Sequence, residues 1–109
     1  MNAQKMWRRQ LAEAVIIAAK PQDDWDTQHR VVFYLKDKGT EVKTLQDMAF
    51  GIYGCDSIHT TDMLRDACVD LMQKGILATK TAFPNVSYRL HPEMSTLIDS
   101  IHLLTQTVH

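Results

Sequence analysis

The stretch "SIHTTDMLRDACVDLMQKGIL", residues 57–77, predicts a helix that ends at a glycine and continues directly into a strand. Its expected core stripe, at helical spacing, consists of Leu64, Cys68 and Leu71. Thr60 or Thr61 is expected to cap the helix, because a hydroxyl can accept a hydrogen bond from an unpaired backbone N–H. The helix is expected to reach Lys74.

Apolar periodicity predicts further helices and strands on both sides of this segment. In chain order they are a helix over 1–20, a helix from Asp26 or Thr27 to Gly39, a short strand centred on Val42, a helix over 44–54, strands over 76–81 and 86–90, and a helix over 92–108. Thr44 with Asp47 weakly resembles a capping box, and Pro84 with Asn85 marks a turn. No linker or repeat interrupts the pattern, so a single domain over 1–109 is expected.

This order of elements resembles the winged helix-turn-helix superfamily. "LMQKGIL" is similar to the end of that family's recognition helix, and "YRLHPE" is similar to the exit from its second wing strand, with His91 where the family often has Thr. "TLQDMAFGIYG" occupies the position of the support helix. The resemblance implies a mainly α fold with a small β wing (α+β), consisting of an N-terminal helix (1–20), a winged-helix core (28–91) and a C-terminal helix (92–108).

The resemblance also implies that the helix within residues 57–77 lies in the major groove of double-stranded DNA, while the wing contacts phosphate or the minor groove. The residues expected to contact DNA are Lys43, His59, Thr60, Thr61, Met63, Arg65, Lys80 and Arg89. Arg65 can reach a guanine edge, and Met63 can contact a thymine methyl group. The expected function is that of a small dimeric transcriptional regulator or a plasmid or phage replication or partition factor.

Three aspartates on the same helix, Asp62, Asp66 and Asp70, oppose DNA binding. Their spacing of four predicts one outward stripe, and a carboxylate beside a phosphate weakens the attraction between protein and DNA. Two alternatives stay open. The stripe is a solvated face in which Asp70 pairs with Lys74, or it is the docking surface of a winged-helix module that binds a basic protein partner.

The helices at the two ends of the chain carry more apolar surface than one small domain readily covers. They are similar in placement to the helices through which MarR-like, PadR-like and plasmid-partition proteins form two-fold dimers. The residues expected at a homodimer interface are Trp7, Leu11, Ile16, Ile17, Leu97, Ile101 and Leu104. The alternative is that the two helices pack on each other within one chain.

The charges nearly balance, with 12 basic and 13 acidic residues and a formal net charge of -1. Any nucleic-acid surface is therefore expected to be local. No apolar run is long enough to span a membrane, and the first residues lack the features of a signal peptide. A cytoplasmic protein without a membrane partner is expected.

Motifs for catalysis and for cofactors are lacking in the sequence. There is no Gly-rich phosphate loop, nucleophile elbow or HExxH pattern, so neither an enzyme nor a cofactor is expected. Cys55 and His59 have no second pair to complete a metal site, so no metal is expected. A ligand pocket involving Trp7, Trp25 and Phe33 is a further alternative, although such aromatic side chains more often pack in a core.

Overall fold

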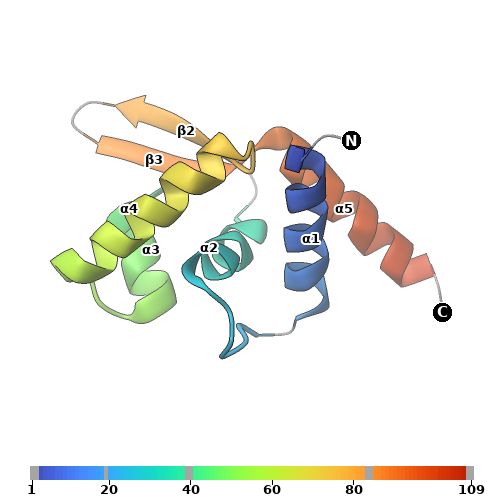
Figure 1. The fold of residues 1–109 in the computed structure, drawn as a ribbon, viewed down its shortest axis with the longest axis horizontal. Helices are drawn as coiled ribbons and strands as arrows, with labels where there is room; N and C mark the ends of the chain where they lie inside the picture. Colours follow the sequence, from blue (N-terminus) through green and yellow to red (C-terminus); the bar gives the residue numbers. More distant parts are fainter. Residues whose placement is uncertain (1–2, 19, 39–40, 83–84, 108–109) are drawn as a thin grey trace.

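The computed structural model describes residues 3–18, 20–38, 41–82 and 85–107 (Figure 1), and the side chains of residues 3–7, 17, 82, 85 and 104–107 lie outside this description. In chain order the elements are α1 (Ala3–Ile17), α2 (Thr27–Lys36), β1 (Lys43–Thr44), α3 (Leu45–Met48), η1 (Ala49–Tyr53), α4 (Ile58–Gln73), β2 (Leu77–Ala82), β3 (Asn85–Leu90) and α5 (Pro92–Thr107). The mainly helical α+β class with a small sheet, expected from the sequence, is confirmed.

The three strands form one antiparallel sheet in the order β1-β3-β2. β2 pairs with β3 along its whole length, with Leu77 opposite Leu90, and β1 pairs with the other edge of β3. Side chains alternate between the two faces of a strand. Tyr88 and Leu90 are buried against the helices, so Arg89 between them faces the other way.

A single hydrophobic core joins α2, α3, α4 and the sheet, and α1 and α5 extend it. The largest fully buried side chains are Leu35, Met48, Leu64, Leu71, Ile76, Met94, Val15, Val31, Val32 and Cys68. The predicted core stripe of α4 is therefore confirmed. Burial also raises the pKa of the Cys68 thiol to about 12, so this cysteine stays protonated and behaves as a small apolar side chain.

The N-terminus of α4 differs from the prediction, because Ser57 is the cap rather than Thr60 or Thr61. Ser57 Oγ accepts a hydrogen bond from the backbone N–H of Thr60 at 3.2 Å. The helix therefore starts at Ile58. A serine three residues before a free N–H is a better cap than a residue already inside the first turn.

The other predicted ends are partly corrected. α1 ends at Ile17 rather than at residue 20, and α2 ends at Lys36. The predicted C-cap Gly39 and the turn residue Pro84 lie outside the described residues. Of the two candidates for the N-cap of α2, the structure has Asp26, whose carboxylate accepts from a backbone N–H.

Gly75 ends α4 as the sequence predicts. Its φ of 73° lies in the left-handed region, and the N–H of Ile76 donates to the carbonyl of Leu71 at 2.9 Å, as in a Schellman motif. Arg8 of α1 lies against this turn. Its Nε donates to the carbonyl of Gly75 at 3.1 Å, and its guanidinium pairs with Glu93 at the start of α5. Arg8 thus ties α1, α4 and α5 together.

Candidate functional site

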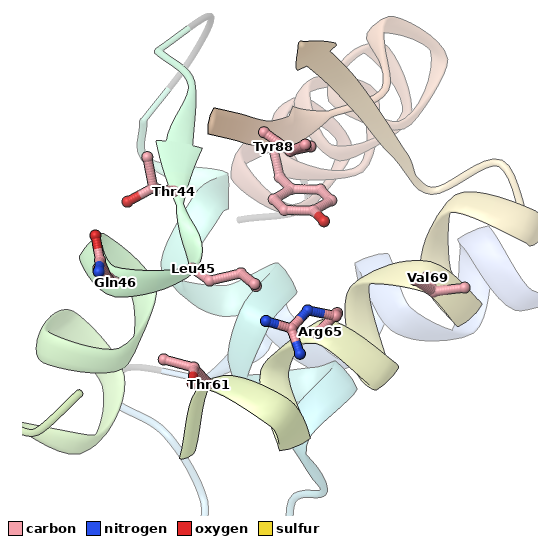
Figure 2. A pocket seen from close by; sticks show the side chains of 8 residues that line it. Thr44, Leu45, Gln46, Thr61, Arg65, Val69 and Tyr88 are labelled. Carbon is pink, nitrogen blue, oxygen red and sulfur yellow. The ribbon is translucent and has the colours of Figure 1, made fainter. Parts of the chain in front are cut away.

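A groove of about 500 Å³ lies between α4, the start of α3 and the sheet (Figure 2). It is lined by Thr44, Leu45, Gln46, Thr61, Arg65, Val69, Val86 and Tyr88, all within the described part of the chain. Hydroxyl, amide and guanidinium groups provide hydrogen-bond donors, and Arg65 is the one charged residue of this set. The groove therefore offers several donors and a single positive charge.

The start of α3 is fixed beside the groove by the capping box that the sequence predicts. Thr44 Oγ1 accepts from the backbone N–H of Asp47 at 3.1 Å, and the Asp47 carboxylate accepts from the backbone N–H of Thr44 at 3.0 Å. Thr44 is also the last residue of β1. Strand and helix therefore meet at one residue, which holds the first turn of α3 next to the sheet.

β3 forms the opposite wall of the groove. Val86 and Tyr88 lie on the same face of β3 as the buried Leu90. The Tyr88 side chain is mostly buried, and its hydroxyl is the part of the ring nearest to Arg65 in Figure 2. Burial raises the pKa of Tyr88, so its hydroxyl is protonated at neutral pH and can donate a hydrogen bond into the groove.

Arg65 is held by an ion pair with Asp62 of its own helix. Its Nη1 lies 2.7 Å from Oδ1 of Asp62, and the two side chains are 54% and 58% exposed. Asp66, one turn beyond Asp62, is also exposed, and within the described residues its side chain forms neither a hydrogen bond nor an ion pair. The two aspartates are similar in exposure but differ in what they contact.

Asp70 differs from the other two residues of the predicted stripe, because it faces α2. Its carboxylate lies 2.8 Å from Lys74 Nζ and accepts a hydrogen bond from Gln28 of α2. These two hydrogen bonds, from Lys74 first, hold the pKa of Asp70 below its usual value. The predicted pair of Asp70 and Lys74 is confirmed, whereas the outward stripe is reduced to Asp62 and Asp66.

Two of the residues predicted on α4, Thr61 and Arg65, line the groove, and the other three do not. Thr60 is buried, and its hydroxyl lies 2.8 Å from Ser57 Oγ and 3.6 Å from Cys55 Sγ. Its hydroxyl is used by the cap of α4, which does not favour a DNA contact, and that contact stays a prediction. His59 is exposed and Met63 is half-buried, both outside the groove.

The predicted cations of the sheet lie apart from Arg65. Arg89 and Lys80 share the face of the hairpin that points away from the core, as the register with Ala78 and Ser87 requires. They border a second hollow of about 270 Å³. Lys43 of β1 is half-buried, with its Nζ 3.5 Å from Glu41. The predicted cations are therefore separated: Arg89 and Lys80 lie together on the outer face of the hairpin, Lys43 pairs with Glu41, and Arg65 lines the groove.

Sequence reasoning missed the residues that the groove takes from α3 and the sheet. They are Thr44, Leu45, Gln46, Val86 and Tyr88, and on α4 itself Val69 was also missed. The available signals were local: Val86, Tyr88 and Leu90 alternate along one predicted strand, and Leu45 follows a predicted cap. None of these signals indicates that the three segments meet.

The predicted dimer residues lie mainly against their own chain. Leu11 is 4% exposed within the protomer's core, because α1 packs on both α2 and α5. This burial favours the alternative in which the helices pack within one chain. Ile16, Leu97 and Ile101 are half-buried against the same core. The side chains of Trp7, Ile17 and Leu104 lie outside the described residues. The homodimer stays a prediction.

Two of the three aromatic side chains considered for a ligand pocket, Trp25 and Phe33, pack on each other. The rings of Trp25 and Phe33 are 5.4 Å apart, and Trp25 also stacks on His29. Lys36 Nζ lies 4.2 Å from the centre of the Phe33 ring. The contacts described for Trp25 and Phe33 are thus those of a side-chain cluster on the edge of the core.

Among the described residues, no group of three or more His, Cys, Asp or Glu side chains is placed to hold a metal ion. None of the described helices is long and apolar enough to cross a bilayer. Cys55 is exposed, and the Thr60 hydroxyl lowers its pKa by hydrogen bonding.

No protein-family model, curated protein or solved structure matches this chain. The function must therefore be argued from the groove and from the elements that form it.

Proposed function

We propose that the chain is a winged helix-turn-helix protein that binds double-stranded DNA. In this proposal α4 is the recognition helix, α3 with η1 is the support helix, and β2 with β3 is the wing. The support for the fold is the order of elements from α2 to β3, together with the sheet order β1-β3-β2. In this order the strand before the support helix pairs with the second strand of the hairpin.

The observation that carries DNA binding is the composition of the groove beside α4. A nucleic-acid backbone presents phosphate oxygens, which accept hydrogen bonds from Arg, Thr, Gln and Tyr side chains. The groove has each of these donors, in Arg65, Thr61, Gln46 and Tyr88, and none of its lining residues is acidic. Exposed Val69 adds an apolar surface suited to a sugar or a thymine methyl group.

The proposal predicts that Arg65→Ala weakens binding to duplex DNA by about tenfold, the effect of losing one well-placed arginine contact. Fluorescence anisotropy with a labelled duplex, measured at several salt concentrations, provides the dissociation constants. The slope of log K against log salt distinguishes the two kinds of contact. A fall of about 1 indicates that Arg65 contacts a phosphate, whereas a nearly unchanged slope with an altered sequence preference indicates a base edge.

The matched control is Arg9→Ala, which removes an exposed arginine on α1 that pairs with Glu13. Arg9 is far along the chain from the groove and is not among its lining residues. Its replacement is expected to leave the dissociation constant within about twofold, as for a surface charge remote from the DNA. Absence of binding by the unchanged protein at low salt, or equal losses for both variants, would contradict the proposal.

A second candidate, a module that binds a basic protein, is favoured by the exposed acidic face of α4. Asp62 and Asp66 lie on this face, and the neighbouring Ile58 is largely exposed. Apolar side chains beside charges are common in protein interfaces. This candidate predicts that the double variant Asp62→Lys, Asp66→Lys loses the basic partner.

The same double variant separates the two candidates by DNA binding alone. If α4 faces DNA, two added cations increase affinity for a non-specific duplex, and the salt slope steepens by up to about 2. If α4 does not face DNA, both quantities are expected to stay unchanged. The measurement is the anisotropy titration used for Arg65→Ala.

A further inference from the structure

Asp62 and Arg65 are surface neighbours on α4, three residues apart, which brings their side chains together on a helix. The contact joins Nη1 of Arg65 to Oδ1 of Asp62 at 2.7 Å. In Figure 2 the Arg65 guanidinium lies on the groove side of α4, near Leu45 and Thr61. The aspartate therefore holds the arginine in a direction in which it can meet a ligand in the groove.

The contact leaves most of the guanidinium available. Arginine has five N–H donors in a planar fork. In the described part of the chain, the hydrogen bond of Nη1 to Asp62 is the one that Arg65 makes. The donors on Nε and Nη2 can therefore still form a bidentate contact with a base edge. Since a long side chain loses rotamer freedom on binding, prior restraint by Asp62 lowers the cost of that contact.

Asp66 provides the internal comparison. It is exposed on the same helix and carries the same charge, but its side chain forms no hydrogen bond or ion pair with Arg65 or with another described residue. A carboxylate near DNA opposes binding to every sequence alike. Asp66 is therefore expected only to weaken binding to all sequences. Asp62 is expected to weaken binding in the same way and, in addition, to hold Arg65.

We infer that Asp62 is a specificity-determining positioning residue, which orients Arg65 so that α4 discriminates between base pairs. This inference rests on the proposed DNA-binding function. It assigns the acidic residue beside the groove a role within DNA recognition: Asp62 lowers affinity for all duplexes but increases the difference between the preferred base pair and the others.

The test uses a preferred duplex selected from a random library with the unchanged protein, and a panel in which each base pair is replaced singly. Arg65→Ala identifies the base pair that Arg65 contacts, as the position where discrimination is lost. At that position Asp62→Ala is expected to reduce discrimination by roughly 2–12-fold, the cost of ordering one long side chain. Asp66→Ala is expected to tighten binding to all duplexes without changing discrimination. Asp62→Glu keeps the carboxylate and is therefore expected to retain the discrimination of the unchanged protein.

The double variant Asp62→Ala, Arg65→Ala separates positioning from direct contact. If Asp62 acts through Arg65, its removal has no further effect on discrimination once Arg65 is absent. A further loss would indicate that Asp62 contacts a base itself and would overturn the inference. Equal behaviour of Asp62→Ala and Asp66→Ala would also overturn it while leaving DNA binding intact, whereas absence of DNA binding by the unchanged protein would refute the proposed function as well.

Discussion

Replacement of Leu71 by alanine is expected to lower the free energy of unfolding by about 2–5 kcal/mol, the usual range for a fully buried leucine. Leu71 is fully buried on α4, which packs against α2 and β2. Domains of this size are stable by about 5–15 kcal/mol, so this one change removes a large part of the total. Urea denaturation followed by circular dichroism measures the difference.

Val69→Ala is the matched control, because Val69 lies two residues away on the same helix and is 45% exposed. Its effect on the free energy of unfolding is expected to stay within about 0.5 kcal/mol, as for most surface substitutions. A similar loss for both variants would contradict the described orientation of α4. The control also tests the groove, since Val69 lines it. Under the proposed function, Val69→Ala is expected to change DNA affinity without changing stability.

The buried face of α4 could be predicted from the sequence because the helical repeat of about 3.6 residues places its apolar residues on one side. Leu64, Cys68 and Leu71 have the spacing of one face, and that face is buried. The N-cap was predicted wrongly because "SIHTT" contains three hydroxyl residues that can each cap a helix. Ser57 is the cap because the helix includes Ile58 and His59, although neither continues the apolar stripe.

The groove could be predicted only in part, since it depends on contacts between distant segments. Thr61 and Arg65 could be predicted because the winged-helix resemblance implies that the N-terminal part of this helix contacts DNA, and both line the groove. Tyr88 was missed because its position depends on strand register, which places it in the core-facing row of β3. The same alternation places Arg89 on the opposite face, away from Arg65.

The aspartate stripe shows a similar limit of periodicity. Residues four apart on an α-helix drift by about 40° at each step, because four residues exceed one turn of 3.6. Over two steps this drift brings Asp70 against Gln28 of α2, while Asp62 stays exposed beside Arg65. The spacing alone predicts that the three aspartates share one outward face. In the structure Asp70 instead contacts α2, and only Asp62 and Asp66 remain on that face.

Gly75→Ala is expected to lower the free energy of unfolding by about 2–3 kcal/mol, through backbone strain and through lost hydrogen bonds of Arg8. The φ of 73° is unfavourable for a residue with a Cβ atom. A Cβ at this position would also collide with Nη2 of Arg8, which is tied to the carbonyl of Gly75 and to Glu93. Thermal or urea denaturation of the purified variant measures the loss.

Gly54 separates the two contributions, because its φ is 75° but, apart from Gly54 itself and its two chain neighbours, no described atom lies within 4 Å of where its Cβ would be. Gly54→Ala is therefore expected to cost the backbone strain alone, about 1–2 kcal/mol. In a protein that already carries Arg8→Ala, the cost of Gly75→Ala is expected to fall to the value for Gly54→Ala, since the colliding side chain is absent. An unchanged cost of Gly75→Ala in that background would mean that Arg8 does not pack on the end of α4, and that α4 and the terminal helices are not coupled through it.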